Sequence, residues 1–237
     1  MKILALESSA VAASAALCED ETLLAQSFQN SGLTHSQTLL PMAKEVMERC
    51  GVAAEDLDLI AVANGPGSFT GLRIGVATAK GLAWAAEKPC AGCSTLESMA
   101  WNLAGLTGEV CAAMDARRNQ VYNARFRVDG ETVERLTPDR AISLEDLVGE
   151  LSGTATEQII VGDGAKLCCD ALVKAGIPAK LAPANLRMQT AWGVARLGLE
   201  LARQGKTVSS QALAPEYHRL SQAERERLER EKAAKPQ

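Results

Sequence analysis

Hydrophobic residues along the chain follow two patterns, short apolar runs typical of strands and the spacing of three to four residues typical of helices, and the first 107 residues contain both. Residues 2–28 hold three short apolar runs separated by polar turns, which predicts three consecutive antiparallel strands. Apolar residues at helical spacing predict amphipathic helices over 34–50 and 70–87, and the apolar run 57–64 between them predicts a buried strand. A short strand over 89–95 and a helix over 96–105 complete this half.

The same order of patterns begins again at residue 109. Residues 109–136 predict three more strands, and a further strand over 158–165 lies among helices predicted at 143–151, 165–176 and 190–205. The sequence therefore predicts an α/β protein with a duplicated fold, of the kind found in actin-like ATPases and sugar kinases. We assign residues 1–107 to an N-terminal subdomain, 108–218 to a C-terminal subdomain and 219–237 to a charged tail.

Each predicted half has a polar turn after its first strand. In the actin-like superfamily the two turns face each other across a cleft and hold phosphates, while glycines after a later strand hold adenosine. This fold-level analogy assigns a nucleotide cleft to Glu7, Ser8, Ser9, Asp115, Arg117, Gly162 and Gly164. Glu7 stands where the superfamily expects Asp, and no glycine follows it to admit phosphates. We therefore interpret the cleft as vestigial, expect no cofactor, and leave weak ATP or ADP binding open.

The glycine-rich segment 64–75, NGPGSFTGLRIG, first suggests a phosphate-binding loop. However, no Lys-Ser or Lys-Thr pair follows at the spacing of a Walker motif, and the dinucleotide motif GxGxxG misses by one residue. Small residues instead recur every four positions at Gly71, Gly75, Ala79 and Ala83. Because glycine inside a helix costs about 1 kcal/mol relative to alanine, this stripe predicts close approach of another backbone. That backbone belongs either to a partner or to the chain's own sheet.

Composition narrows the classes of function. The net charge of −4 argues against a stand-alone nucleic-acid binder, and no apolar run is long enough to span a membrane. Seven cysteines, an odd number in apolar contexts, are typical of reduced thiols, and we expect a cytoplasmic protein. Cys90 and Cys93 form a CxxC without a second pair, and His35 and His218 are the only histidines. We therefore expect no metal site.

Several segments together resemble the bacterial TsaB (YeaZ) family. They are GPGSFTGLRIGVATAKGLA at 65–83, THSQTLLP at 34–41, STLESMA at 94–100 and MDARRNQVYNARF at 114–126. The resemblance is strong over residues 1–130 and weaker beyond. The family is a paralogue of the TsaD threonylcarbamoyltransferases within the actin-like superfamily.

The resemblance implies a non-catalytic subunit that works with TsaD and TsaE to form N6-threonylcarbamoyladenosine beside the tRNA anticodon. The resemblance also implies that TsaD holds the ATP and the metal, and that the chain contacts tRNA mainly as part of the complex. It implies a homodimer when TsaD is absent. The implied partner surface comprises His35, Leu39, Ala43, Val46, Gly71, Arg73, Gly75, Ala79 and Ala83. The alternatives are an independent ATP-dependent kinase or ATPase, and a glycoprotease-type peptidase. A peptidase would need a zinc pair or a nucleophile with its base, which two distant histidines do not supply.

Overall fold

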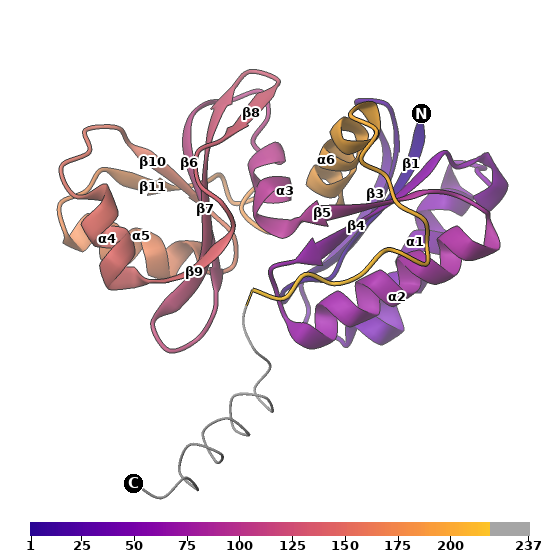
Figure 1. Ribbon diagram of the computed structural model, residues 1–237, viewed down its shortest axis with the longest axis horizontal. Helices are drawn as coiled ribbons and strands as arrows, with labels where there is room; N and C mark the ends of the chain where they lie inside the picture. Colours follow the sequence, from indigo (N-terminus) through magenta and orange to yellow (C-terminus); the bar gives the residue numbers. More distant parts are fainter. Residues whose placement is uncertain (219–237) are drawn as a thin grey trace, which may run out of the picture.

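The computed structural model describes residues 1–218, and two β-sheets organise it (Figure 1). The first sheet has the strand order β3-β2-β1-β4-β5. Its strands are β1 (Lys2–Glu7), β2 (Ala13–Glu19), β3 (Thr22–Gln29), β4 (Leu59–Gly65) and β5 (Cys90–Ser94). Short turns make β1, β2 and β3 antiparallel, whereas crossover helices return β4 and β5 parallel to β1.

The second sheet repeats this arrangement in the order β11-β10-β6-β7-β8, and β9 pairs with β7. Its strands are β6 (Thr107–Asp115), β7 (Gln120–Asp129), β8 (Thr132–Arg135), β9 (Arg140–Ser143), β10 (Gln158–Val161) and β11 (Ala179–Leu181). Strands β6, β7, β8, β10 and β11 occupy the places of β1, β2, β3, β4 and β5. The duplication predicted from the sequence is therefore confirmed.

Helices cover both faces of each sheet. On the first sheet, α1 (His35–Arg49) and α2 (Phe69–Ala85) pack on one face, and the 3₁₀ turn η1 (Ala54–Asp56) precedes β4. On the second, α4 (Leu144–Leu151) and α5 (Ala165–Lys174) pack on one face and α3 (Thr95–Trp101) on the other. Serine N-caps begin α2, α3 and α4, where Ser68, Ser94 and Ser143 accept backbone N–H bonds.

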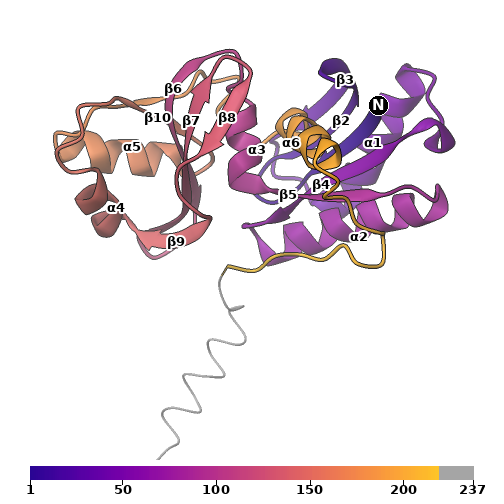
Figure 2. The same ribbon diagram turned by 45° about the horizontal axis from the view of Figure 1, so that its top comes forward.

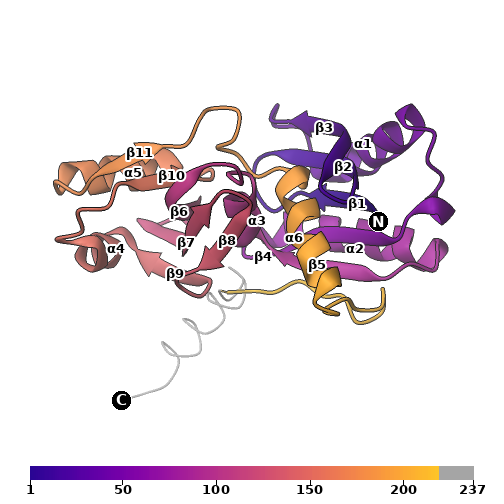
Figure 3. The same cartoon turned by 90° about the horizontal axis from the view of Figure 1, so that it is seen from above.

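The last helix of residues 1–218, α6 (Ala191–Arg203), packs on the first sheet and not on the second. Its Val194 and Ala195 join a core with Ile3, Ala5 and Ala61. Figures 2 and 3 show α6 and α3 side by side between the two sheets. Assigning all of 108–218 to a C-terminal subdomain is therefore wrong for α6, because periodicity identifies a helix but not the sheet that it covers.

Residues 206–217, which we call the C-terminal strap, follow α6 and run along the free edge of β5 toward the start of α2 (Figure 1). Cys90 N–H donates to Val208 O at 2.8 Å, and Glu216 N–H donates to Asn64 O at 2.7 Å. Tyr217 stacks on Phe69 with ring centroids 4.5 Å apart. The strap thus protects the exposed hydrogen-bonding edge of the sheet. The predicted charged tail at 219–237 lies outside the described residues.

Candidate functional site

The turn after β1 is closed by its own hydrogen bonds and by α2. Glu7, Ser8 and Ser9 are at most 1% exposed. Ser9 N–H donates to Glu7 Oε1 at 2.6 Å, and the Ser8 hydroxyl donates to Gly71 O at 3.0 Å. Ser68 N–H donates to Ser9 O at 2.7 Å. These groups are thus engaged within the chain, where a phosphate-binding turn would offer its donors to a ligand.

Three glycines of the segment 64–75 make room for this turn. A β-carbon on Gly67 would lie 2.5 Å from Ser9 O, and one on Gly75 would lie 2.6 Å from Ser8 Oγ. A β-carbon on Gly71 would overlap the carbonyl oxygen of Ser8. Such close approach requires glycine. The backbone that comes close to the stripe of small residues on α2 is therefore that of the chain's own β1–β2 turn.

The partner surface expected from the sequence is wrong for seven of its nine residues. These seven side chains and glycines are buried within the chain, against the first sheet and the β1–β2 turn: Leu39, Ala43, Val46, Gly71, Gly75, Ala79 and Ala83. The alternative of packing on the chain's own sheet is the arrangement observed. The pattern of small residues showed that a backbone comes close, but not to which chain that backbone belongs.

The other two residues of that expected surface have partners inside the chain. The His35 Nε2 atom lies 2.7 Å from Ala10 O. Arg73 Nε donates to the Tyr217 hydroxyl at 2.9 Å, and its guanidinium carbon lies 5.8 Å from the Tyr217 ring centroid. Arg73 therefore helps to hold the C-terminal strap on α2.

The turn after β6 differs from the turn after β1 because it is open to solvent. Asp115 and Arg117 are exposed, and Arg117 N–H donates to Asp115 Oδ1 at 2.7 Å. Gly162 and Gly164 are buried against the end of β6, where Gly164 N–H donates to Ala113 O at 3.1 Å. A β-carbon on Gly164 would lie 2.8 Å from Asp115 N. These glycines thus allow close packing between the start of α5 and β6.

Carboxyl groups gather where the two halves meet. Burial, together with a smaller contribution from the nearby Asp163 carboxylate, raises the pKa of Glu7 to about 7. Glu7 Oε2 is buried without a hydrogen-bond partner among residues 1–218. Burial also raises the pKa of Asp163, and the Asp115 carboxylate contributes to this increase. The hydrogen bond of 2.8 Å that Gln189 Nε2 donates to Asp163 Oδ1 opposes it. A polyphosphate would therefore meet carboxyl groups here, where a phosphate site offers backbone N–H donors.

Neither Asp163 nor Gln189 is among the site residues predicted from the sequence. The signal for Asp163 was its place between two glycines after a strand, where a carboxylate lies at the end of the sheet. Gln189 lies in the segment before α6 and carries no comparable pattern.

The CxxC cysteines lie inside the first sheet. Cys90 and Cys93 are both on β5 and fully buried. Burial raises the pKa of the Cys90 thiol to about 11 and raises that of Cys93 as well. Both thiols therefore stay protonated at neutral pH, as is typical of reduced cysteines in apolar surroundings.

Within residues 1–218, no group of three or more His, Cys, Asp or Glu side chains is arranged to hold a metal ion. No helix of that part of the chain is long and apolar enough to cross a membrane.

The repeated strand order and the paired turns define the fold class, which is the duplicated fold of actin-like ATPases and sugar kinases. The family model for tRNA N6-adenosine threonylcarbamoyltransferase, TsaD, matches residues 29–226. The tRNA threonylcarbamoyladenosine biosynthesis protein TsaB of Bacillus subtilis is 32% identical over 98% of this chain and 100% of its own length. TsaB of Escherichia coli is 33% identical over 92% of this chain and 95% of its own.

Solved structures agree with these relatives. YeaZ from Pseudomonas aeruginosa superposes with a TM-score of 0.78 at 26% identity, covering 91% of this chain and 99% of that one. The chain therefore belongs to the TsaB (YeaZ) family. Both the resemblance found in the sequence and the expected fold are confirmed.

Proposed function

We propose that this chain acts in tRNA threonylcarbamoyladenosine biosynthesis as a non-catalytic subunit that binds the transferase TsaD. Membership of the TsaB family supports the pathway. The closed β1–β2 turn supports the non-catalytic role, and it is the observation on which that role depends. Ser9 N–H bonds to Glu7 Oε1, while Glu7 and Asp163 place carboxyl groups where phosphates would need donors.

The outer faces of α1 and α2 form the surface that would bind TsaD. Gly81 is exposed in the middle of α2, and a β-carbon there would meet nothing within 4 Å. Its cost of about 1 kcal/mol relative to alanine thus has no compensation within residues 1–218, unlike that of Gly71. Next to it Trp84 is 72% exposed, and on α1 Leu40 is 50% exposed. A partner helix packed here would bury both side chains and explain the glycine.

The remaining assignments follow from this surface. Two copies of the chain use it for a homodimer when TsaD is absent, since the same apolar side chains then need cover. ATP and metal belong to TsaD, and TsaE joins the assembled complex.

The test compares two exposed helical glycines. Gly81→Leu abolishes the heterodimer with TsaD on size exclusion, because the leucine blocks close approach. Gly149→Leu on α4 is the matched control, since Gly149 is also exposed with nothing within 4 Å of an added β-carbon. That variant binds TsaD normally, and both variants unfold at or above the wild-type temperature.

Wild-type affinity of Gly81→Leu for TsaD contradicts the surface assignment. Reconstituted tRNA modification that proceeds equally well without this chain contradicts the function itself.

A further inference from the structure

The loop between β6 and β7 has an unusual backbone. Arg117, Arg118 and Asn119 have φ angles of 66°, 55° and 56°, so three consecutive residues with side chains are left-handed. A left-handed conformation costs about 1–2 kcal/mol for each such residue. The loop is nevertheless fixed by hydrogen bonds from Gln120 N–H to Arg117 O at 3.2 Å and from Leu144 N–H to Asn119 O at 3.1 Å. The fold therefore holds two adjacent arginines at the tip of this hairpin.

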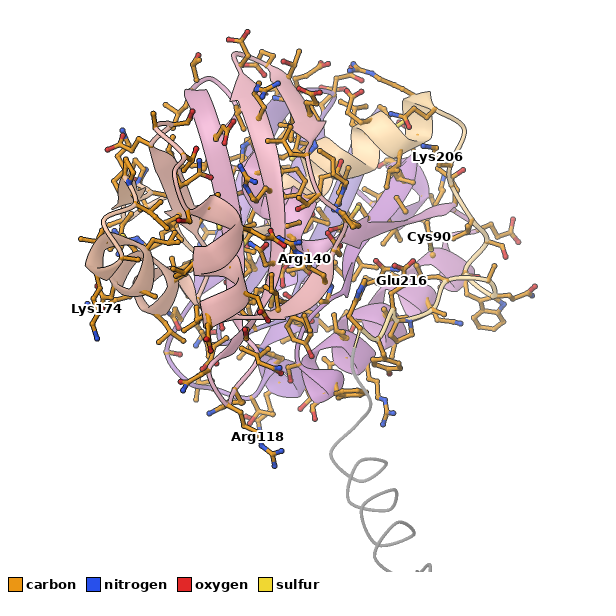
Figure 4. All side chains as sticks on the ribbon, turned by 60° about the vertical axis from the view of Figure 1, so that its left-hand side comes forward. Cys90, Arg118, Arg140, Lys174, Lys206 and Glu216 are labelled. Carbon is orange, nitrogen blue, oxygen red and sulfur yellow. The ribbon has the colours of Figure 1, made fainter. Side chains whose placement is uncertain are left out.

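These two arginines differ from the others in the described part of the chain. Arg117 and Arg118 are exposed, and within residues 1–218 their side chains have no hydrogen-bond or ion-pair partner. Figure 4 shows Arg118 projecting outward from the ribbon. The nine other arginines of residues 1–218 each donate to a carboxylate, a hydroxyl or a backbone carbonyl: Arg49, Arg73, Arg125, Arg127, Arg135, Arg140, Arg187, Arg196 and Arg203.

We propose that Arg117 and Arg118 bind phosphodiester oxygens of the tRNA substrate. This inference depends on the proposed function, because that function supplies a polyanionic substrate. The planar guanidinium group donates two parallel hydrogen bonds to a phosphate, and the two side chains are free to do so. The neighbouring carboxylate of Asp115 is turned back to accept from Arg117 N–H, and the N-terminal end of α5 packs beside it.

The position of the loop favours RNA over an acidic protein surface. The surface proposed for TsaD lies on α1 and α2 of the first half, whereas this loop belongs to the second sheet. The chain carries a net charge of −4, whereas the two unpaired arginines make the tip of this loop positively charged. An RNA backbone, with one negative charge on each nucleotide, matches such an isolated basic tip.

The test measures binding of an unmodified tRNA transcript to the complex of full-length chain and TsaD between 50 and 300 mM salt. Each lost phosphate contact lowers the slope of log K against log salt by about 0.7–0.9. Arg117→Gln/Arg118→Gln therefore lowers affinity roughly 25- to 60-fold at 0.1 M salt if both contacts are lost. The control Arg127→Gln/Arg203→Gln removes two ion-paired charges, those bonded to Glu134 and Glu200, and leaves affinity within about twofold of wild type.

Arg117→Lys/Arg118→Lys keeps the charge and restores most of the salt slope, which separates phosphate binding from misfolding of the loop. Wild-type affinity and slope in the Gln double variant overturn the proposal. Loss of the TsaD heterodimer in that variant also overturns it, because the loop would then contact protein. Failure of the proposed function is distinguishable, since the wild-type chain would then fail to bind TsaD.

Discussion

Gly71 and Gly81 lie on the same helix, and the structure predicts opposite effects when each is changed to alanine. A β-carbon on Gly71 overlaps the Ser8 carbonyl oxygen, which belongs to the backbone and moves only with the whole β1–β2 turn. The same change also disturbs the hydrogen bond of 3.0 Å from the Ser8 hydroxyl to Gly71 O. A β-carbon on Gly81 meets no atom within 4 Å.

The magnitudes follow from these contacts. Overpacking a well-packed site costs about 1–3 kcal/mol, and a weakened buried hydrogen bond adds roughly 1 kcal/mol. Helix propensity returns at most about 1 kcal/mol at either position. We expect Gly71→Ala to lower the free energy of unfolding by about 1–3 kcal/mol and Gly81→Ala to raise it by about 0.5–1 kcal/mol.

Urea unfolding at equal protein concentration measures both values, with an unchanged m-value showing that the two variants unfold in the same way as wild type. If Gly71→Ala is as stable as wild type, the β1–β2 turn does not pack on α2 as described. If Gly81→Ala is destabilised, some part of the chain covers Gly81, and the exposed face assigned to TsaD is incorrect.

Two further predictions concern Glu7 and Tyr217. The folded pKa of Glu7, about 7 against an ordinary 4.5, means that the native state holds an extra proton between these pH values. The free energy of unfolding therefore falls as pH rises through this window, and this group contributes about 3 kcal/mol of the fall. Urea denaturation at pH 5 and pH 8 measures the difference, and Glu7→Gln removes the part due to Glu7. An unchanged pH dependence in Glu7→Gln contradicts the prediction. Tyr217→Ala removes the Phe69 stack and the Arg73 bond, so amide hydrogen exchange at Glu216 accelerates, while wild-type exchange argues against the strap contacts.

Periodicity could predict most of the fold because it reports which positions are buried. The alternating runs and helical stripes predict nine of the eleven strands and all six α-helices of residues 1–218. It failed for β9 (Arg140–Ser143) and β11 (Ala179–Leu181), because four and three residues are too few to show alternation. It also failed for the C-terminal strap, because residues 206–217 form neither a regular helix nor a strand and therefore show neither spacing.

The candidate site was harder to predict than the fold. The stripe of small residues on α2 indicated that another backbone comes close. Which backbone this is depends on the tertiary structure, and the spacing of residues along the sequence does not show it. Gly81 belonged to the same sequence segment as Gly71 and Gly75, and only their surroundings distinguish the exposed glycine from the two buried ones. Likewise, the unpaired state of Arg118 depends on where distant carboxylates lie.

The location of α6 has a consequence for synthesis on the ribosome. Residues 107–181 supply every strand of the second sheet from one continuous stretch, so that half is complete before the chain ends. The first sheet emerges earlier, yet the face that contains Ile3 and Ala61 stays uncovered until Ala191–Arg203 has been translated. The second half can therefore fold before the first is finished, which reverses the usual N-terminal-first order and leaves the earliest strands dependent on α6.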